Sequence, residues 1–137
     1  AQAPAPSERA LAQADARWLF EQQEQAQPLL SQVLRTPLSE QLRGAVAADR
    51  LLSEALISDL YGQLLAASDI TTDYYQGDEI SFQQSRDLLD DDLLLEPIAY
   101  DSSTQKLAIR VSGPIHDGGP DQFLGVLTLG VDIEQLH

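Results

Sequence analysis

The segment ALISDLYGQLLAAS (residues 55–68) places two short apolar runs on either side of Tyr61-Gly62-Gln63. Gly62 can adopt the positive φ angle that a tight turn requires, and the Asp59 carboxylate can accept hydrogen bonds from the turn backbone. Apolar runs of this length around a glycine-containing turn predict a β-hairpin. The segments on both sides of the hairpin then decide the fold class.

Three apolar segments follow the hairpin and predict further strands, at residues 93–100, 107–115 and 123–132. Pro97 lies inside the first of them, which indicates an edge strand or a bulge because proline has no N–H for the sheet. The last segment, FLGVLTLGVD, is apolar on both faces and predicts a central strand.

The region between the hairpin and these strands, residues 69–92, is polar, aromatic and acidic. We expect it to form a long insertion that contains one short helix around residues 78–89. No internal repeat is present in the sequence.

The N-terminal third of the sequence predicts helices. Residues 1–6 contain two prolines and predict a disordered lead-in, followed by a long helix from Ser7 to about Arg35 that Pro28 kinks or breaks. Trp18 on this helix is interpreted as a packing anchor. Thr36-Pro37 is typical of a helix start and predicts a second helix to about Ser53.

Together these elements predict an α+β fold, with a long N-terminal helix and a second helix packed on a roughly five-stranded antiparallel sheet. The length of 137 residues suits one domain. Residues 1–35 would form the lead-in and a stalk or dimer helix, and residues 36–137 would form the domain proper.

Composition excludes several functions. The chain has 8 basic and 22 acidic residues, and residues 58–137 contain 15 acidic and 3 basic ones, so no nucleic-acid partner is expected. The absence of cysteine excludes disulfides and thiolate sites. No apolar run reaches the roughly 18 residues of a membrane span. The absence of methionine predicts that the chain is a piece or processed product of a longer protein.

Three motifs carry a resemblance to a known family. The hairpin DLYGQLLAAS (59–68) resembles that of Cache domains, which are extracytoplasmic PAS-like (PDC) sensors, and TDYYQGDE (72–79) resembles the segment that follows it in a subset of these sensors. GPI (113–115) and the final strand are similar to the last hairpin of the family. The resemblance covers roughly residues 36–136.

The resemblance implies a single-Cache sensor domain in the periplasmic part of a bacterial inner-membrane receptor, between two transmembrane helices. A sensor histidine kinase is favoured, with a chemoreceptor or a diguanylate cyclase as the other outputs. It also implies a homodimer formed through the long N-terminal helix. A small ligand would lie between the sheet and the insertion at residues 69–92.

Several side chains are candidates for contacting such a ligand. Asp73 could hold an ammonium group, and Tyr74, Tyr75 and Tyr100 could provide rigid walls with hydroxyl donors. Arg110 could hold a carboxylate with two hydrogen bonds, and Ser112 lies on the same side of the strand. The alternative is structural: Asp73 would cap a turn, the tyrosines would fill the top of the sheet, and Arg110 would pair with a surface acid.

The ligand suggested by these groups is a small carboxylate or an amino acid. The strongly negative surface favours a zwitterion or a cation over a simple anion.

An acidic cluster at residues 87–92 raises a second possibility. Asp90, Asp91 and Asp92 could offer oxygen ligands to a divalent cation, but the spacing of a calcium loop is absent and a solvated helix end is the preferred interpretation.

No catalytic constellation or cofactor-binding motif is present, so we expect a non-enzymatic domain without a cofactor. The alternatives to ligand sensing are a dimerisation or periplasmic-partner domain that binds no ligand, and divalent-cation sensing through the acidic cluster.

Overall fold

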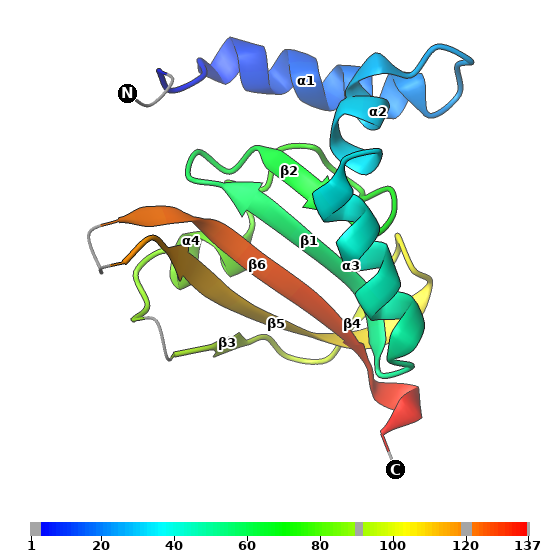
Figure 1. Ribbon diagram of the computed structural model, residues 1–137, viewed down its shortest axis with the longest axis vertical. Helices are drawn as coiled ribbons and strands as arrows, with labels where there is room; N and C mark the ends of the chain where they lie inside the picture. Colours follow the sequence, from blue (N-terminus) through cyan, green and yellow to red (C-terminus); the bar gives the residue numbers. More distant parts are fainter. Residues whose placement is uncertain (1–3, 90–91, 119–121, 137) are drawn as a thin grey trace.

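The computed structural model describes residues 4–89, 92–118 and 122–136. Figure 1 shows N-terminal helices stacked on a twisted sheet, with the two described ends at opposite ends of the molecule. The helices are α1 (Glu8–Glu21), α2 (Pro28–Leu34), α3 (Pro37–Ala48), α4 (Ile80–Ser85) and the 3₁₀ helix η1 (Ile133–Gln135). The strands are β1 (Leu52–Asp59), β2 (Leu64–Ala67), β3 (Leu94–Leu95), β4 (Ala99–Asp101), β5 (Lys106–His116) and β6 (Phe123–Asp132).

The strands form one antiparallel sheet in the order β2-β1-β6-β5-β3, and β4 also pairs with β5. The predicted α+β class is therefore confirmed, as is the central position of the strand at residues 123–132, which pairs with β1 on one side and β5 on the other. The described sheet has six strands where about five were expected. The difference arises at Pro97, because the predicted strand at residues 93–100 is divided into β3 and β4.

The hairpin forms as predicted, with Gly62 at φ +82° in its turn. Asp59 Oδ1 accepts hydrogen bonds from the backbone N–H groups of Tyr61 and Gln63 at 2.9 and 3.0 Å. The insertion packs against this turn, because the N–H of Gln76 donates to the carbonyl oxygen of Gly62 at 2.6 Å. A Cβ at Gly62 would overlap the backbone of Gly77, so glycine is required for this close approach.

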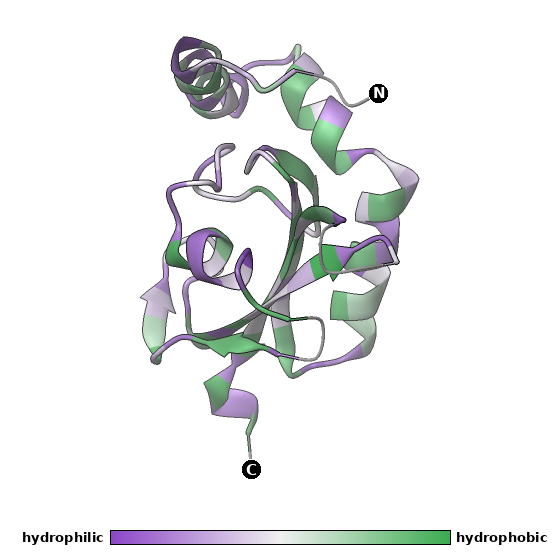
Figure 2. Cartoon of the chain, turned by 90° about the vertical axis from the view of Figure 1, so that its left-hand side faces the viewer, coloured by the Kyte–Doolittle hydropathy of each residue, from purple (hydrophilic) through white to green (hydrophobic). Residues whose placement is uncertain are grey.

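Helix α3 lies against one face of the sheet, whereas α4 and the insertion lie against the other (Figure 2). Ser39 fixes α3 in place: its hydroxyl donates to the carbonyl of Val33 at 2.6 Å and accepts from the N–H of Ala67 in β2 at 3.0 Å. The prediction that this helix continues to Ser53 is wrong, since α3 ends at Ala48. The residues that follow are recruited into β1, where Leu52 pairs with Val131 of β6.

The predicted long N-terminal helix is interrupted. The break expected at Pro28 is present, but α1 already ends at Glu21, so a continuous helix up to Pro28 is wrong. The buried Glu21 side chain provides the physical reason, because its Oε1 accepts hydrogen bonds from the N–H groups of Leu29 and Leu30 at 2.8 and 3.0 Å. A side chain from the end of α1 thereby caps the start of α2.

The hydrophobic core lies where α1 and α2 meet the hairpin. Trp18 is fully buried, which confirms its expected role as a packing anchor. The core side chains are Trp18, Leu29, Leu30, Val33, Leu56, Leu64, Ala67 and Tyr74. Because this set combines helix, strand and insertion residues, α1 and α2 pack directly on the remainder of the fold.

Candidate ligand-binding pocket

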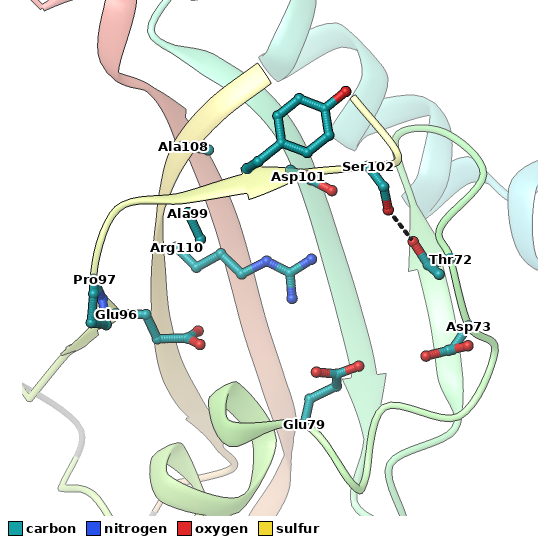
Figure 3. A pocket seen from close by; sticks show the side chains of 11 residues that line it. Thr72, Asp73, Glu79, Glu96, Pro97, Ala99, Asp101, Ser102, Ala108 and Arg110 are labelled. Atoms are coloured by element: carbon teal, nitrogen blue, oxygen red, sulfur yellow. Dashed lines mark hydrogen bonds between the residues drawn. The ribbon is translucent and has the colours of Figure 1, made fainter. Parts of the chain in front are cut away.

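A pocket of about 310 Å³ opens between the insertion and the strands β4 and β5 (Figure 3). This volume lies at the lower end of the range typical of small-molecule sites. Its lining residues come from the insertion, from the segment around Pro97 and from β5: Thr72, Asp73, Glu79, Glu96, Pro97, Ala99, Tyr100, Asp101, Ser102, Ala108 and Arg110.

The rim of the pocket is closed on one side by a contact between two loops. The hydroxyl oxygens of Thr72 and Ser102 lie 3.5 Å apart, and both residues are exposed (Figure 3). Thr72 belongs to the insertion and Ser102 follows β4. A distance of 3.5 Å marks a weak hydrogen bond, so little energy holds this part of the rim together.

Arg110 extends from β5 into the pocket and is held by a carboxylate from another strand. Its Nη2 lies 3.5 Å from Oε1 of Glu54 on β1, although β6 runs between these two strands. Gly130 of β6 is paired in register with both residues. Because Gly130 has no side chain, the guanidinium and the carboxylate can meet across the intervening strand.

Glu54 is buried, and the Ser103 hydroxyl lies within hydrogen-bond distance of both its carboxyl and that of Asp101. Ser103 Oγ lies 3.0 Å from Glu54 Oε2 and 2.8 Å from Asp101 Oδ1. The pKa of Glu54 is raised to about 7, first by burial and then by the nearby Asp101, whereas Arg110 opposes both effects. Asp101 shifts the other way: burial alone would raise its pKa, but hydrogen bonds from Ser103 and Glu54 lower it overall. The proton of this pair therefore resides on Glu54.

The insertion supplies two further carboxyls to the opposite wall. Burial raises the pKa of Asp73, and the neighbouring carboxylates of Asp15 and Asp78 raise it further. Figure 3 shows the Asp73 and Glu79 carboxyls on the side of the pocket facing β5.

The pKa of Glu79 is also raised, first by burial. Arg110 lowers it, but the nearby carboxylates of Asp78, Asp73 and Glu96 act in the upward direction. Repulsion between neighbouring carboxylates therefore adds to burial in raising the pKa values of Asp73 and Glu79.

The sequence-predicted ligand residues divide into two groups. Asp73, Tyr100 and Arg110 line the pocket together. The other three, Tyr74, Tyr75 and Ser112, are not among its lining residues.

These three side chains have structural surroundings. Tyr74 is buried in the core, with its ring centroid 5.9 Å from that of Trp18. The Tyr75 ring covers Gly77. Ser112 is buried, and its hydroxyl oxygen lies 3.0 Å from that of Thr128 on β6.

Four acids at or beside the pocket were not singled out from the sequence: Glu54, Glu79, Glu96 and Asp101. Glu54 had a detectable signal, since it is a lone charge next to the apolar run that forms β1. The other three lie in polar stretches, where a pocket residue and a solvated residue look alike in sequence.

The acidic cluster at residues 87–92 is only partly described. Asp90 and Asp91 lie outside the described residues, whereas Asp87 and Asp92 are exposed. Across the described parts of the chain, no three acidic or histidine side chains converge in an arrangement suited to a metal ion. Likewise, none of the helices in these parts combines the length and hydropathy that crossing a membrane requires.

Comparison with known proteins gives a consistent result at the level of the fold. No protein-family model matches the sequence, and a search of curated proteins gave no match. Among solved structures, the extracellular domain of the histidine-kinase candidate rpHK1S-Z16 is 21% identical with a TM-score of 0.60, over 87% of this chain and 46% of that one.

Two further matches are the sensor domains of a chemoreceptor and of a histidine kinase. The sensory domain of the Campylobacter jejuni chemoreceptor Tlp3 with isoleucine bound is 15% identical, with a TM-score of 0.60 over 92% of this chain and 51% of that one. The sensor domain of the V. cholerae histidine kinase DctB is 16% identical, with a TM-score of 0.56 over 92% of this chain and 44% of that one.

These likenesses show that the chain has the fold of the extracellular sensor domains of histidine kinases and chemoreceptors, the Cache or PDC-like fold. The resemblance seen in the sequence is confirmed at this level. The chain spans about half the length of the solved chains that it matches.

Proposed function

We propose that this chain is the extracytoplasmic ligand-binding domain of a bacterial membrane receptor, with a sensor histidine kinase as the favoured output and a chemoreceptor or diguanylate cyclase as the others. In this proposal the domain is itself non-catalytic, lies in the periplasm and is joined to transmembrane helices in the full-length protein. The observation that carries the proposal is the polar pocket between the sheet and the insertion, on a fold that solved sensor domains share.

The ligand in this proposal is a small polar molecule, of which an amino acid is the simplest example. Arg110 offers a guanidinium to a carboxylate, and Asp73 faces it from the insertion as a partner for an ammonium group (Figure 3). Tyr100 lines the pocket and adds an aromatic surface.

Signal transfer would pass from the insertion to α1. Trp18 Nε1 donates to the carbonyl of Thr71 at 2.8 Å, and Asp15 Oδ1 accepts from the N–H of Tyr75 at 2.7 Å. A ligand that favours one position of the insertion therefore favours one position of α1, which is a shift between two populated packings.

A homodimer through α1 is part of the proposal. Leu19 and Phe20 near the end of this helix are 58% and 64% exposed, which gives α1 an apolar surface available to a second copy. If no ligand binds, the same surface supports the alternative function, a dimerisation or periplasmic-partner domain.

The direct test is a thermal-shift screen of the purified chain with amino acids, small carboxylates, polyamines and divalent cations at fixed pH and salt. A ligand that binds only the folded state raises the unfolding temperature with the logarithm of its concentration. We expect a rise with one organic class, lost in Arg110→Ala and Asp73→Ala and retained in Arg50→Ala, which removes an exposed charge outside the pocket.

A rise with divalent cations alone would instead favour sensing through the cluster at residues 87–92. A flat screen across all four classes would contradict ligand sensing and favour the dimerisation or partner-binding alternative.

A further inference from the structure

The charge balance of the pocket is strongly negative. Four carboxyl groups line it, from Asp73, Glu79, Glu96 and Asp101, whereas Arg110 is the only basic residue among its lining side chains. A zwitterionic ligand with one ammonium and one carboxylate group would leave this imbalance unchanged.

Arg110 also has a carboxyl partner before any ligand arrives. Its guanidinium lies 3.5 Å from Glu54, and its side chain is only 30% exposed. Within the described residues the ion pairs are Arg17–Glu21, Lys106–Asp132 and Arg110–Glu54, so no basic side chain pairs with the remaining pocket acids. The four pocket acids therefore take part in no ion pair among the described residues, although Arg110 is near enough to lower the pKa values of Glu79 and Asp101.

Glu96 gives an independent indication that a donor is missing. Its Oε2 is buried and has no hydrogen-bond partner among the described residues. The backbone N–H of Glu96 donates to the carbonyl of Arg110 at 3.0 Å, which fixes the residue beside β5. Figure 3 shows its carboxylate turned toward the pocket interior. Burying such an oxygen without a partner is costly, and a cationic donor in the pocket would remove that cost.

The arrangement of the acids favours an organic cation over a metal ion as the ligand. Asp73 and Glu79 come from the insertion, whereas Glu96 and Asp101 come from the segment that follows it and lie across the pocket (Figure 3). No three of the described acids converge as a metal site would require. Two positive groups held apart by an alkyl spacer fit this distribution better than one small ion.

We propose that the pocket selects a small organic dication, a molecule with two positively charged nitrogen groups on a short alkyl spacer, such as a diamine or a basic amino acid. One nitrogen group would lie between Asp73 and Glu79, and the other would reach Glu96. This inference rests on the proposed function, because it assigns a ligand class to the same pocket.

The test uses three matched probes with the purified chain, in calorimetric titrations at 150 mM salt. Norvaline carries one ammonium and one carboxylate group, ornithine adds a second ammonium at the end of its side chain, and 1,4-diaminobutane retains both ammonium groups without the carboxylate. Magnesium chloride is the fourth probe, and it tests for simple cation binding.

We expect ornithine and 1,4-diaminobutane to bind at least tenfold more tightly than norvaline, with no saturable binding of magnesium. Tighter binding of 1,4-diaminobutane than of ornithine would identify a diamine, and the reverse order would identify a basic amino acid that uses Arg110.

Two variants test whether Glu96 binds the second ammonium group of ornithine. Glu96→Gln should weaken ornithine binding at least fivefold and leave norvaline binding unchanged, because only the second ammonium group would reach Glu96. Glu24→Gln removes the same charge from an exposed position outside the pocket and should leave both affinities unchanged. Unfolding curves of the two variants check that both remain folded.

Different experimental results would contradict the dication proposal and the proposed ligand-binding function on which it rests. Equal affinity for norvaline and ornithine, with binding of both lost in Arg110→Ala, would contradict selection of a dication. It would still be consistent with amino-acid sensing. Saturable magnesium binding that displaces ornithine would also contradict selection of a dication. No binding of any probe, together with a flat thermal-shift screen, would overturn both proposals.

Discussion

Glu54 on β1 and Arg110 on β5 face one another across Gly130 of the intervening strand β6, with 3.5 Å between Glu54 Oε1 and Arg110 Nη2. The pair joins three neighbouring strands beneath the pocket. Because Glu54 also contacts Ser103, which hydrogen-bonds Asp101, the protonation state of one buried carboxyl is linked to the loop that closes the pocket rim.

The first prediction concerns the pH dependence of stability. The raised pKa of Glu54, about 7, means that the folded chain keeps a proton that the unfolded chain releases above pH 4.5. This residue therefore lowers the free energy of unfolding as pH rises from 4.5 to 7, by at most about 3 kcal/mol, and has no further effect above that.

Glu54→Gln should remove this loss, because glutamine stays neutral and can still donate a hydrogen bond to Asp101. Urea unfolding followed by the fluorescence of Trp18, the single tryptophan, would measure it at intervals between pH 4.5 and 7.5. The stability of the variant relative to the wild type should increase across this window. Parallel curves for the two proteins would contradict the assignment of the proton to Glu54.

The second prediction concerns Glu21, whose carboxylate caps α2. Glu21→Ala would leave the N–H groups of Leu29 and Leu30 without their acceptor, which should lower the free energy of unfolding by roughly 2–4 kcal/mol. Glu21→Gln keeps one acceptor oxygen and should lose less.

The matched control is Arg17→Ala. Its guanidinium contacts Glu21 Oε2 at 3.1 Å, but the side chain is 58% exposed, so the loss should stay below about 1 kcal/mol. Urea titrations of the variants provide the measurement. Equal losses in Glu21→Ala and Arg17→Ala would show that the ion pair, rather than the cap, carries the stability.

The third prediction concerns the connection between α1 and the pocket wall. Trp18→Phe keeps a buried ring but removes the hydrogen bond to the Thr71 carbonyl, leaving an unsatisfied buried acceptor and costing about 2 kcal/mol or more. Amide hydrogen exchange should also become faster in residues 71–76, because the insertion loses an anchor.

The control for Trp18→Phe is Leu19→Ala, the adjacent residue on the exposed face of α1. It should change stability by less than about 0.5 kcal/mol in the monomer and leave exchange in the insertion unaltered. Circular dichroism would follow unfolding, because Trp18→Phe removes the fluorophore. Unchanged exchange in Trp18→Phe would argue against coupling between α1 and the insertion.

The fourth prediction compares two glycine-to-alanine substitutions. A Cβ at Gly77 would overlap the Tyr75 ring, so Gly77→Ala must displace that ring and should destabilise the fold by roughly 1–3 kcal/mol. Gly44 lies inside α3 with open space around its Cα, so Gly44→Ala should stabilise the fold by about 0.5–1 kcal/mol. Thermal unfolding of the two variants should therefore shift in opposite directions, and a shift in the same direction would contradict the described packing of Tyr75.

The sequence predicted those parts of the fold that local patterns decide. The hairpin, the strands at residues 107–115 and 123–132 and the break at Pro28 follow from turn chemistry, apolar runs and proline geometry, and each is present. The end of α3 and the interruption after Glu21 depend on partners that lie in other elements of the fold. Pairing of Leu52 with Val131 and capping of Leu29 by Glu21 have no local signature.

The same distinction applies to the candidate site. Arg110 stood out because it is a charge in an alternating apolar strand, and its position on the same face as Ala108 places both in the pocket. Glu54 became a partner of Arg110 only through the register of three strands. The role of Tyr74 could not be decided from its sequence neighbours, because both a pocket wall and a core position accept a tyrosine.

The two edges of the sheet are poor templates for pairing with another chain. On the β5 side, Pro97 divides the outer strand into β3 and β4, and β5 itself carries Pro114 where it runs beyond β3. On the β2 side, Gln63 forms a bridge to Tyr75 of the insertion. Edge-to-edge addition of strands, the first step of many aggregation reactions, therefore finds few free backbone groups in the described sheet. Pro97, which lines the pocket, is one of these interruptions, and we expect them to oppose β-aggregation in a concentrated solution of this domain.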